Sequence, residues 1–208
     1  VSENELIPFL NEIFLSFKEL ALTKEINYTF EYKQPDIKIW FDVNQMEKVF
    51  YNLLSNAFKH TPLKGNITIR VEEIDFFVVI SVIDDGVGID KKVLDQIFER
   101  FYQVENSVQD MISRQGSGIG LSLAKGIVNL HHGEIGVNSE PQYGSRFWVK
   151  LQKGDNHFTA DQKIKHYHKD EESIIELSIP DKTFMNEILF SQQESESLNS
   201  TILIIEDN

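Results

Sequence analysis

Three short stretches of the sequence carry residues whose types and spacing could do chemistry. The first is a polar stripe formed by Asn52, Asn56 and Lys59, with His60 at its edge. These residues share one side of an expected helix, because successive helical residues turn by about 100°. A carboxamide oxygen can ligate Mg²⁺ without adding negative charge, and a lysine can meet a phosphate oxygen. A solvated polar face of the helix is the alternative interpretation.

The second stretch is VIDDGVGID, residues 82–90. A run of aliphatic residues ends at Asp84, and Gly86 and Gly88 allow backbone bends that bring the main chain close to a flat ligand. The Asp84 carboxylate could accept a hydrogen bond from an exocyclic amino group such as that of adenine. An ordinary Asp-Asp-Gly turn is the alternative.

The third stretch has glycines at three alternate positions, Gly116, Gly118 and Gly120, directly before an expected helix. Exposed N–H groups at a helix N-terminus favour binding of an anion, and phosphate is the expected ligand. The spacing fits neither the dinucleotide-binding fingerprint nor the Walker loop. Close packing of a glycine-rich helix start is the alternative.

Residues 97–115 lie between the second and third stretches. Phe98, Phe101 and Tyr102 come first, and a mostly polar run then leads to the glycines, as in a mobile lid over a ligand. Arg100 and Arg114 could reach phosphates from there. An undistinguished surface loop is the alternative.

Hydrophobic periodicity predicts the elements that must position these residues. A helix is expected over 2–20, opened by a capping box of Ser2 and Glu5, and a hairpin-like pair of strands over 26–32 and 37–41. The remaining elements are a helix over 43–60, adjacent antiparallel strands over 66–75 and 76–84, a short helix near 91–99, a helix over 119–132, and strands over 134–139 and 145–152. This order predicts an α/β (α+β) two-layer sandwich with helices on one face of a mixed sheet.

Composition excludes several classes of function. The 20 basic and 33 acidic residues give a net charge of −13, which disfavours nucleic acid and anionic membrane surfaces as partners. The absence of cysteine excludes disulfides and thiolate metal sites and agrees with a reducing compartment. No apolar run is long enough to span a membrane. Because the chain begins at Val1 and stops in the strand-like run TILIIEDN, we expect an excised part of a longer protein.

The order of these motifs resembles the N, G1, F, G2 and G3 boxes of sensor histidine kinases. It runs through Asn-x-x-x-Asn-Ala-x-Lys, Asp-x-Gly-x-Gly, Phe-x-x-Phe, Gly-x-Gly-x-Gly-Leu and Gly144-Ser145-x-Phe147. The resemblance covers residues 1–152 and implies the catalytic ATP-binding domain of the GHKL superfamily, with a Bergerat-type fold. The sheet is then largely antiparallel.

The resemblance also implies a role for each site residue. Asn56 is expected to ligate Mg²⁺ with Asn52 beside it, Lys59 and Arg100 to contact phosphates, and Asp84 to bind the adenine amino group. Asn56, Lys59 and Arg100 are thus the catalytic set. The other expected nucleotide contacts are His60, Gly86, Gly88, Tyr102, Gly116, Gly118, Gly120, Leu121 and Ser145.

The expected activity is transfer of the γ-phosphoryl group of ATP to a histidine. None of the six histidines has the phosphoacceptor setting, so the acceptor is expected on a dimerisation helix outside residues 1–208. Positioning, Mg²⁺ and cationic side chains would then carry catalysis. An ATPase of the same superfamily and a degenerate docking domain are the alternatives.

Residues 153–200 are polar and are predicted to be a linker, partly disordered. Residues 201–208 look like the first strand of a receiver domain, with Glu206 and Asp207 beginning its acidic pocket. These features predict a hybrid sensor kinase, of which this chain would be a cytoplasmic part of a membrane-bound protein.

Overall fold

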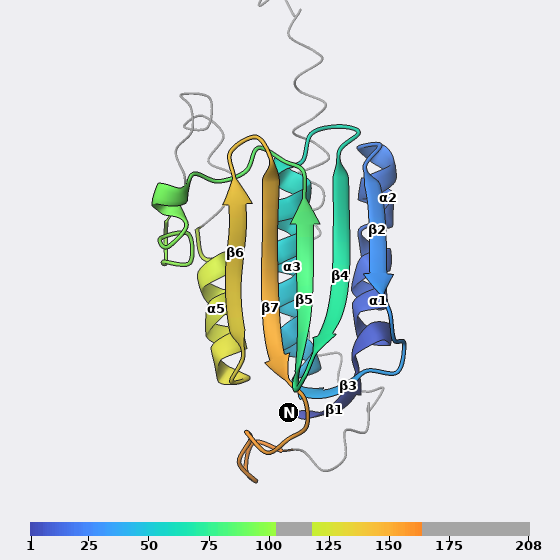
Figure 1. Ribbon diagram of the computed structural model, residues 1–208, viewed down its shortest axis with the longest axis vertical. Coiled ribbons are helices and arrows are strands. Elements are labelled where there is room, and N and C mark those ends of the chain that lie inside the picture. The colour runs from blue at the N-terminus through green and yellow to red at the C-terminus, as the bar shows by residue number, and fades with distance from the viewer. Residues whose placement is uncertain (103–117, 164–208) are drawn as a thin grey trace, which may run out of the picture. The chain divides into compact units, whose positions relative to one another are not determined.

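The computed structural model describes residues 1–102 and 118–163. A five-stranded sheet forms one layer, in the order β2-β4-β5-β7-β6 (Figure 1). β2 and β4 are parallel, and the other neighbours are antiparallel. The strands are β2 (Asn27–Tyr32), β4 (Asn66–Ile74), β5 (Phe77–Asp84), β6 (Glu134–Glu140) and β7 (Gly144–Gln152).

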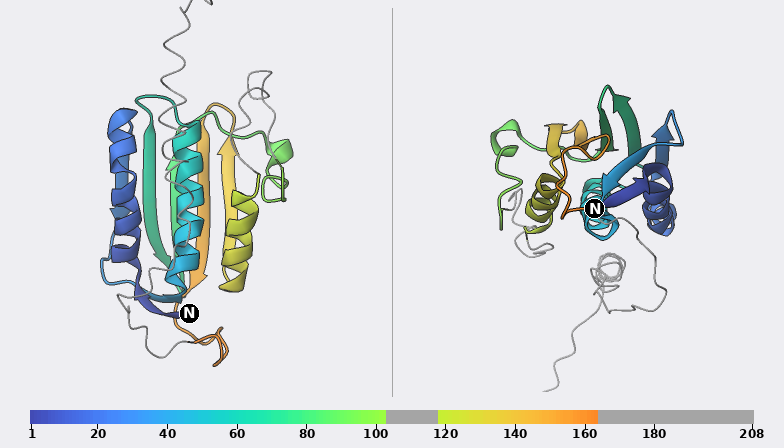
Figure 2. Two further views of the ribbon diagram at one scale, coloured as in Figure 1. Left: turned by 180° about the vertical axis from the view of Figure 1, so that it is seen from behind. Right: turned by 90° about the horizontal axis from the view of Figure 1, so that it is seen from below.

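The helices form the second layer, on one face of the sheet, as the view from below in Figure 2 shows. In the described residues they are α1 (Leu6–Ser16), α2 (Lys18–Thr23), α3 (Val43–His60) and α5 (Gly120–Leu130). A 3₁₀ turn, η1 (Lys91–Val93), follows β5. The expected two-layer α/β sandwich with a mixed, largely antiparallel sheet is confirmed. The expected helix near 91–99 is wrong, because only η1 and successive turns form there.

The central helix α3 has the bounds that its hydrophobic period predicts. Asp42 caps its start, because the Asp42 carboxylate accepts a hydrogen bond from the Gln45 N–H at 3.0 Å. It buries one side against the sheet, and Thr61 is extended just before Pro62, which ends the helix at His60. The fully buried residues of that side include Met46, Val49, Leu53, Leu54 and Phe58. Polar side chains of α3 therefore lie on the part of the helix surface that does not face the sheet.

Two expectations for the first 41 residues are wrong. Residues 2–5 form the strand β1 (Ser2–Glu5), which pairs with β3 (Lys38–Phe41), and the helix begins only at Leu6. Glu5 makes no side-chain cap, so the predicted capping box does not form. The Asn4 side chain instead donates to the Phe41 carbonyl at 3.0 Å. Long-range pairing has overridden a local cap signal.

The predicted hairpin between the strands at 26–32 and 37–41 does not form either. β2 pairs in parallel with β4, and Tyr28 lies opposite Ile67 in the register. In this arrangement Tyr28 and Phe30 pack against Phe14 of α1 on the helix side of the sheet.

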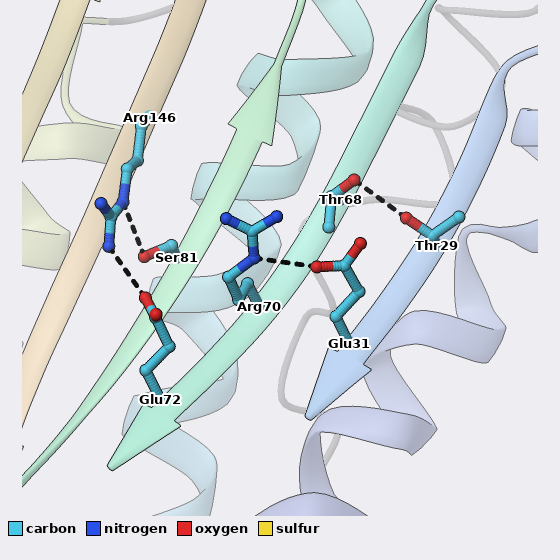
Figure 3. Close-up of polar contacts among 7 residues, drawn as sticks. All are labelled: Thr29, Glu31, Thr68, Arg70, Glu72, Ser81 and Arg146. Carbon is cyan, nitrogen blue, oxygen red and sulfur yellow. Dashed lines mark hydrogen bonds and ion pairs between the residues drawn. The ribbon is translucent and has the colours of Figure 1, made fainter. Parts of the chain in front are cut away.

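The sheet face away from the helices is covered by its own side chains (Figure 3). Arg146 Nε donates to Ser81 Oγ at 3.1 Å, and Arg146 also pairs with Glu72 at 3.2 Å. Arg70 pairs with Glu31 on the neighbouring strand at 2.8 Å. Exposed ion pairs contribute little stability individually, but these side chains bury Ser81 completely. This part of the face is therefore occupied by hydrogen-bonded and ion-paired polar side chains.

His131, directly after α5, joins the ends of two helices. Its Nδ1 lies 2.8 Å from the Ile127 carbonyl, and its Nε2 accepts the Asp42 N–H at 3.0 Å. Nε2 must therefore be unprotonated, so the ring is neutral with its proton on Nδ1. Burial lowers the pKa of His131, which agrees with this state.

The segment after β7 packs against this end of the domain. The Lys153 N–H donates to the Phe76 carbonyl at 2.8 Å, and the buried Phe158 ring contacts His131 and His132. Residues 164–208, with most of the predicted linker and the predicted receiver strand, lie outside the described residues. In the described part of the chain, no helix has the length and apolar character to cross a membrane.

Candidate functional site

Four elements bring the predicted site residues to one end of the sheet. β5 ends there at Asp84, and β7 begins there with Ser145 directly opposite Asp84 in the register (Figure 1). The last turn of α3 reaches the same end, because the His60 carbonyl accepts the Val87 N–H at 3.4 Å. The first residue of α5, Gly120, contacts Asn52 of α3.

Asp84 is a buried carboxylate with main-chain donors. The residue is only 6% exposed, and its Oδ1 accepts a hydrogen bond from the Gly86 N–H at 3.0 Å. Burial raises the pKa of Asp84 to about 6, although hydrogen bonds from the Gly86 and Ser145 main chains act in the opposite direction. At neutral pH this group is mainly an ionised acceptor, and it becomes protonated in mild acid. Such a group suits recognition of an N–H donor in a flat ligand.

The loop after Asp84 is clamped on both sides. On one side, a Cβ atom on Gly86 would collide with the His60 carbonyl. On the other side, Gly88 adopts a φ of +67° and packs against the Glu140 main chain, where no side chain would fit. The loop therefore has one fixed path between α3 and the turn that joins β6 to β7.

Ser139 completes this clamp, and sequence reasoning missed it. Its Oγ accepts the Ile89 N–H at 2.8 Å and lies 2.9 Å from Ser145 Oγ. Ser139 faces Ser145 across the β6–β7 pair. The only signal that could have found it is the register of the predicted hairpin, because the residue itself belongs to no motif.

Asn52 and Asn56 lie one turn apart on α3. Asn52 Nδ2 donates to the Lys48 carbonyl at 2.8 Å, and this bond directs Asn52 Oδ1 toward Gly120. Asn56 is half-buried, whereas Lys59 and His60 in the last turn are exposed. Leu121, half-buried, follows Gly120 in the first turn of α5. The predicted stripe thus faces the start of α5 at the Asn52 position.

Phe101 and Gly118 meet at the edge of the site. The Phe101 N–H donates to the Gly118 carbonyl at 2.9 Å, and Gly118 adopts a φ of +65° against the Phe101 and Tyr102 main chains. Tyr102 is half-buried, and Arg100 is exposed two residues before it. Gly116, Arg114 and the rest of the predicted lid at 103–115 lie outside the described residues.

The electrostatics of this end favour an anionic ligand. The N-terminus of α5 carries the positive end of the helix dipole and begins at Gly118, Ile119 and Gly120. Within residues 1–102 and 118–163, no three histidine or carboxylate side chains are grouped as a metal site.

Comparison with known proteins identifies a matching family and similar proteins. Residues 41–155 match the family described as histidine kinase-, DNA gyrase B-, and HSP90-like ATPase. The chain is 37% identical over 210 residues to histidine kinase P4 of Formosa agariphila, covering 100% of the chain and 15% of that protein. It is 30% identical over 148 residues to the sensor histidine kinase YvrG of Bacillus subtilis, covering 71% of the chain and 25% of that protein. The chain thus spans a quarter or less of these relatives.

The fold has a close counterpart among solved structures. The catalytic domain of the histidine kinase ThkA superposes with a TM-score of 0.64 at 27% identity. The match covers 73% of this chain and 94% of that domain.

Proposed function

The chain belongs to the family of histidine kinase-, DNA gyrase B- and HSP90-like ATPases and is homologous to the catalytic domains of sensor histidine kinases, and from this we propose how it acts. It binds ATP with Mg²⁺ and transfers the γ-phosphoryl group to a histidine outside residues 1–208. The observation that supports this most directly is the convergence of Asp84, the Gly86–Gly88 loop, Asn52 and the N-terminus of α5 at one end of the sheet.

Each proposed role follows from the chemistry of a side chain at that end. The Asp84 carboxylate accepts a hydrogen bond from the adenine amino group, and the clamped loop with Gly86 and Gly88 admits the flat ring. His60 and Tyr102 border the nucleotide. Gly118, Gly120 and Leu121 present the start of α5 to the phosphates, with Gly116 before them, and Ser145 supports Asp84 from β7.

The site fits a magnesium ion held mainly by the nucleotide. Asn56 supplies an amide oxygen, with Asn52 one turn before it, and the phosphates supply the negative charge. A bound ion would supply positive charge that neutralises the phosphates.

This chain contributes positioning and positive charge to the transfer. Lys59, and Arg100 from its exposed position, contact the phosphate oxygens, where negative charge is spread in the transition state. The attack needs no proton-transferring side chain of this chain, because a neutral imidazole attacks through its unprotonated nitrogen, whose lone pair is already free.

We propose that the acceptor histidine is carried by a helix that docks beside the α5 start. Ile119 and Leu123 expose apolar surface on one side of α5, and Phe101, next to Gly118, is 73% exposed. Apolar patches at the rim of a site are typical of contact surfaces. The downstream receiver domain is a further proposed partner, as the next domain of the full-length protein.

Calorimetric titration of the chain with ATP, first with Mg²⁺ and then with a chelator, tests this proposal. We expect saturable one-to-one binding that Mg²⁺ strengthens, with little phosphate release. Steady phosphate release would favour an ATPase of the same family instead. No binding by a folded sample would contradict the proposal and leave a docking role.

A further inference from the structure

Lys24 is a buried cationic residue that the proposed function does not use. It follows α2 directly and is only 8% exposed. Its Nζ donates to the carbonyl oxygen of Phe58, in the last turn of α3, at 2.7 Å. Lysine is rarely buried to this degree unless its ammonium group has a partner.

The Phe58 carbonyl needs a donor from outside the helix. The residue four positions later is Pro62, which has no N–H, and Thr61 is extended before it. An ammonium group at this place also complements the negative end of the α3 dipole. Burial lowers the pKa of Lys24, as expected for an ammonium group removed from water.

The main chain of Lys24 holds the following turn as well. Its carbonyl accepts the Lys64 N–H at 3.1 Å, in the connection from α3 to β4. Residue 24 therefore contacts both the last turn of α3 and the turn after it. This last turn carries Lys59 and His60.

The last turn of α3 also contacts the loop after Asp84 in the candidate site. The His60 carbonyl accepts the Val87 N–H and lies against Gly86. Gly86 in turn donates to Asp84. A shift in the last turn of α3 would therefore move Lys59 and the loop after Asp84 together.

We propose that Lys24 is a positioning residue of the nucleotide site, which fixes the last turn of α3 and through it Lys59 and the Gly86 loop. This inference rests on the proposed function. The test compares Lys24→Met, which keeps the length of the side chain and removes its donor, with Lys64→Met as a matched control. Lys64 is nearby, and its side chain is 73% exposed.

We expect Lys24→Met to be folded and to bind MgATP about tenfold more weakly, which corresponds to about 1.4 kcal/mol. Lys64→Met should stay within about twofold of the unsubstituted chain, a difference well under 1 kcal/mol. Lys24→Arg keeps a cationic donor and should recover most of the loss. In ¹H–¹⁵N spectra, the amide shifts of Lys24→Met should concentrate at residues 59–60 and 86–87.

Each contrary result is distinct. Unchanged affinity in folded Lys24→Met, while the unsubstituted chain binds, would overturn the inference alone. Equal losses in Lys24→Arg and Lys24→Met would assign the effect to packing and also overturn it. No binding by the unsubstituted chain would overturn the proposed function and this inference with it. If Lys24→Met is unfolded, Lys24→Leu, which also has no donor, takes its place in the same titration, and unchanged affinity would again overturn the inference.

Discussion

The amide oxygen of Asn52 lies against Gly120, so close that a methyl group at residue 120 would overlap it. The Asn52 side chain cannot easily rotate away from Gly120, because its Nδ2 donates a hydrogen bond to the Lys48 carbonyl. The contact sets the spacing between α3 and the start of α5, which are the two helical walls of the candidate site.

Gly120→Ala should therefore weaken nucleotide binding without unfolding the chain. The added Cβ displaces the Asn52 side chain, while alanine is a better helix former than glycine by about 1 kcal/mol. We expect the Kd for MgATP to rise about tenfold, measured by calorimetry.

Gly126→Ala is the matched control on the same helix. Among the described residues, a Cβ built at Gly126 meets no atom within 4 Å beyond its chain neighbours and the backbone of its own helix. This variant should raise the free energy of unfolding by about 0.5–1 kcal/mol and leave nucleotide affinity unchanged. Equal effects of the two substitutions on affinity would contradict the assigned role of the Asn52 contact.

Asn56→Ala should remove the Mg²⁺ dependence of ATP binding. The substitution deletes the amide oxygen proposed as a metal ligand and leaves a good helix former in its place. The measurement is ATP titration with and without a chelator, and Asn44→Ala, at an exposed position of α3, is the control. Binding that still responds to the chelator in Asn56→Ala would refute the metal assignment.

Nucleotide binding should weaken in mild acid. The pKa of Asp84 is raised to about 6 by burial, so the carboxylate acceptor is lost as the pH falls below this value. We expect the Kd for adenosine and for ATP to rise between pH 7 and pH 5. In Asp84→Asn the Kd should be high and nearly constant over this range. An unaltered pH profile in Asp84→Asn would exclude Asp84 as the titrating acceptor.

The same group should affect stability with the opposite pH dependence. Because the pKa of Asp84 is higher in the folded chain than its ordinary value of 3.8, the folded chain binds more protons between pH 4 and pH 6. Its contribution to the free energy of unfolding is therefore largest in acid and is lost as the pH rises through this window. Urea unfolding should show Asp84→Asn gaining stability relative to the unsubstituted chain from pH 4.5 to pH 7.

His131 should make the chain sensitive to acid. Its pKa is lowered by burial, so below about pH 6.5 the unfolded chain takes up a proton that the folded chain does not. The contribution of His131 to the free energy of unfolding should fall as the pH drops from 6.5, whereas that of Asp84 changes in the opposite direction. His131→Leu should lose this slope and about 1–3 kcal/mol at pH 7.5, because the Asp42 N–H loses its acceptor. His132→Asn, at an exposed neighbour, should keep the slope.

Sequence reasoning succeeded where a local pattern and the final packing agree. The bounds of α3 follow from its apolar period, the Asp42 cap and Pro62, and β4 and β5 follow from alternation on both sides of a short turn. The arrival of Asp84 at a strand end was predictable for the same reason. These features depend on neighbours a few residues away in the chain.

Prediction from the sequence failed where the two segments that pair or bond lie far apart in the chain. Nothing in the sequence near residue 28 indicates that β2 pairs with β4. The residues of the predicted capping box, Ser2 and Glu5, instead form a strand that pairs with β3. Ser139 and Lys24 support the site through hydrogen bonds to main-chain groups of distant segments. Such bonds require only a suitable donor or acceptor, so they leave no motif in the sequence.

The parallel pairing of β2 with β4 has a consequence for synthesis. The ribosome releases α1, α2 and β2 before α3 and β4 exist, so at that stage the aromatic contacts of Tyr28 and Phe30 are limited to Phe14 and Tyr32. The β4–β5 hairpin can form from adjacent residues, whereas β2 must wait for a partner some 39 positions downstream, as the separation of Thr29 and Thr68 shows. β2 is thus translated early and can complete its pairing only after β4 has been made.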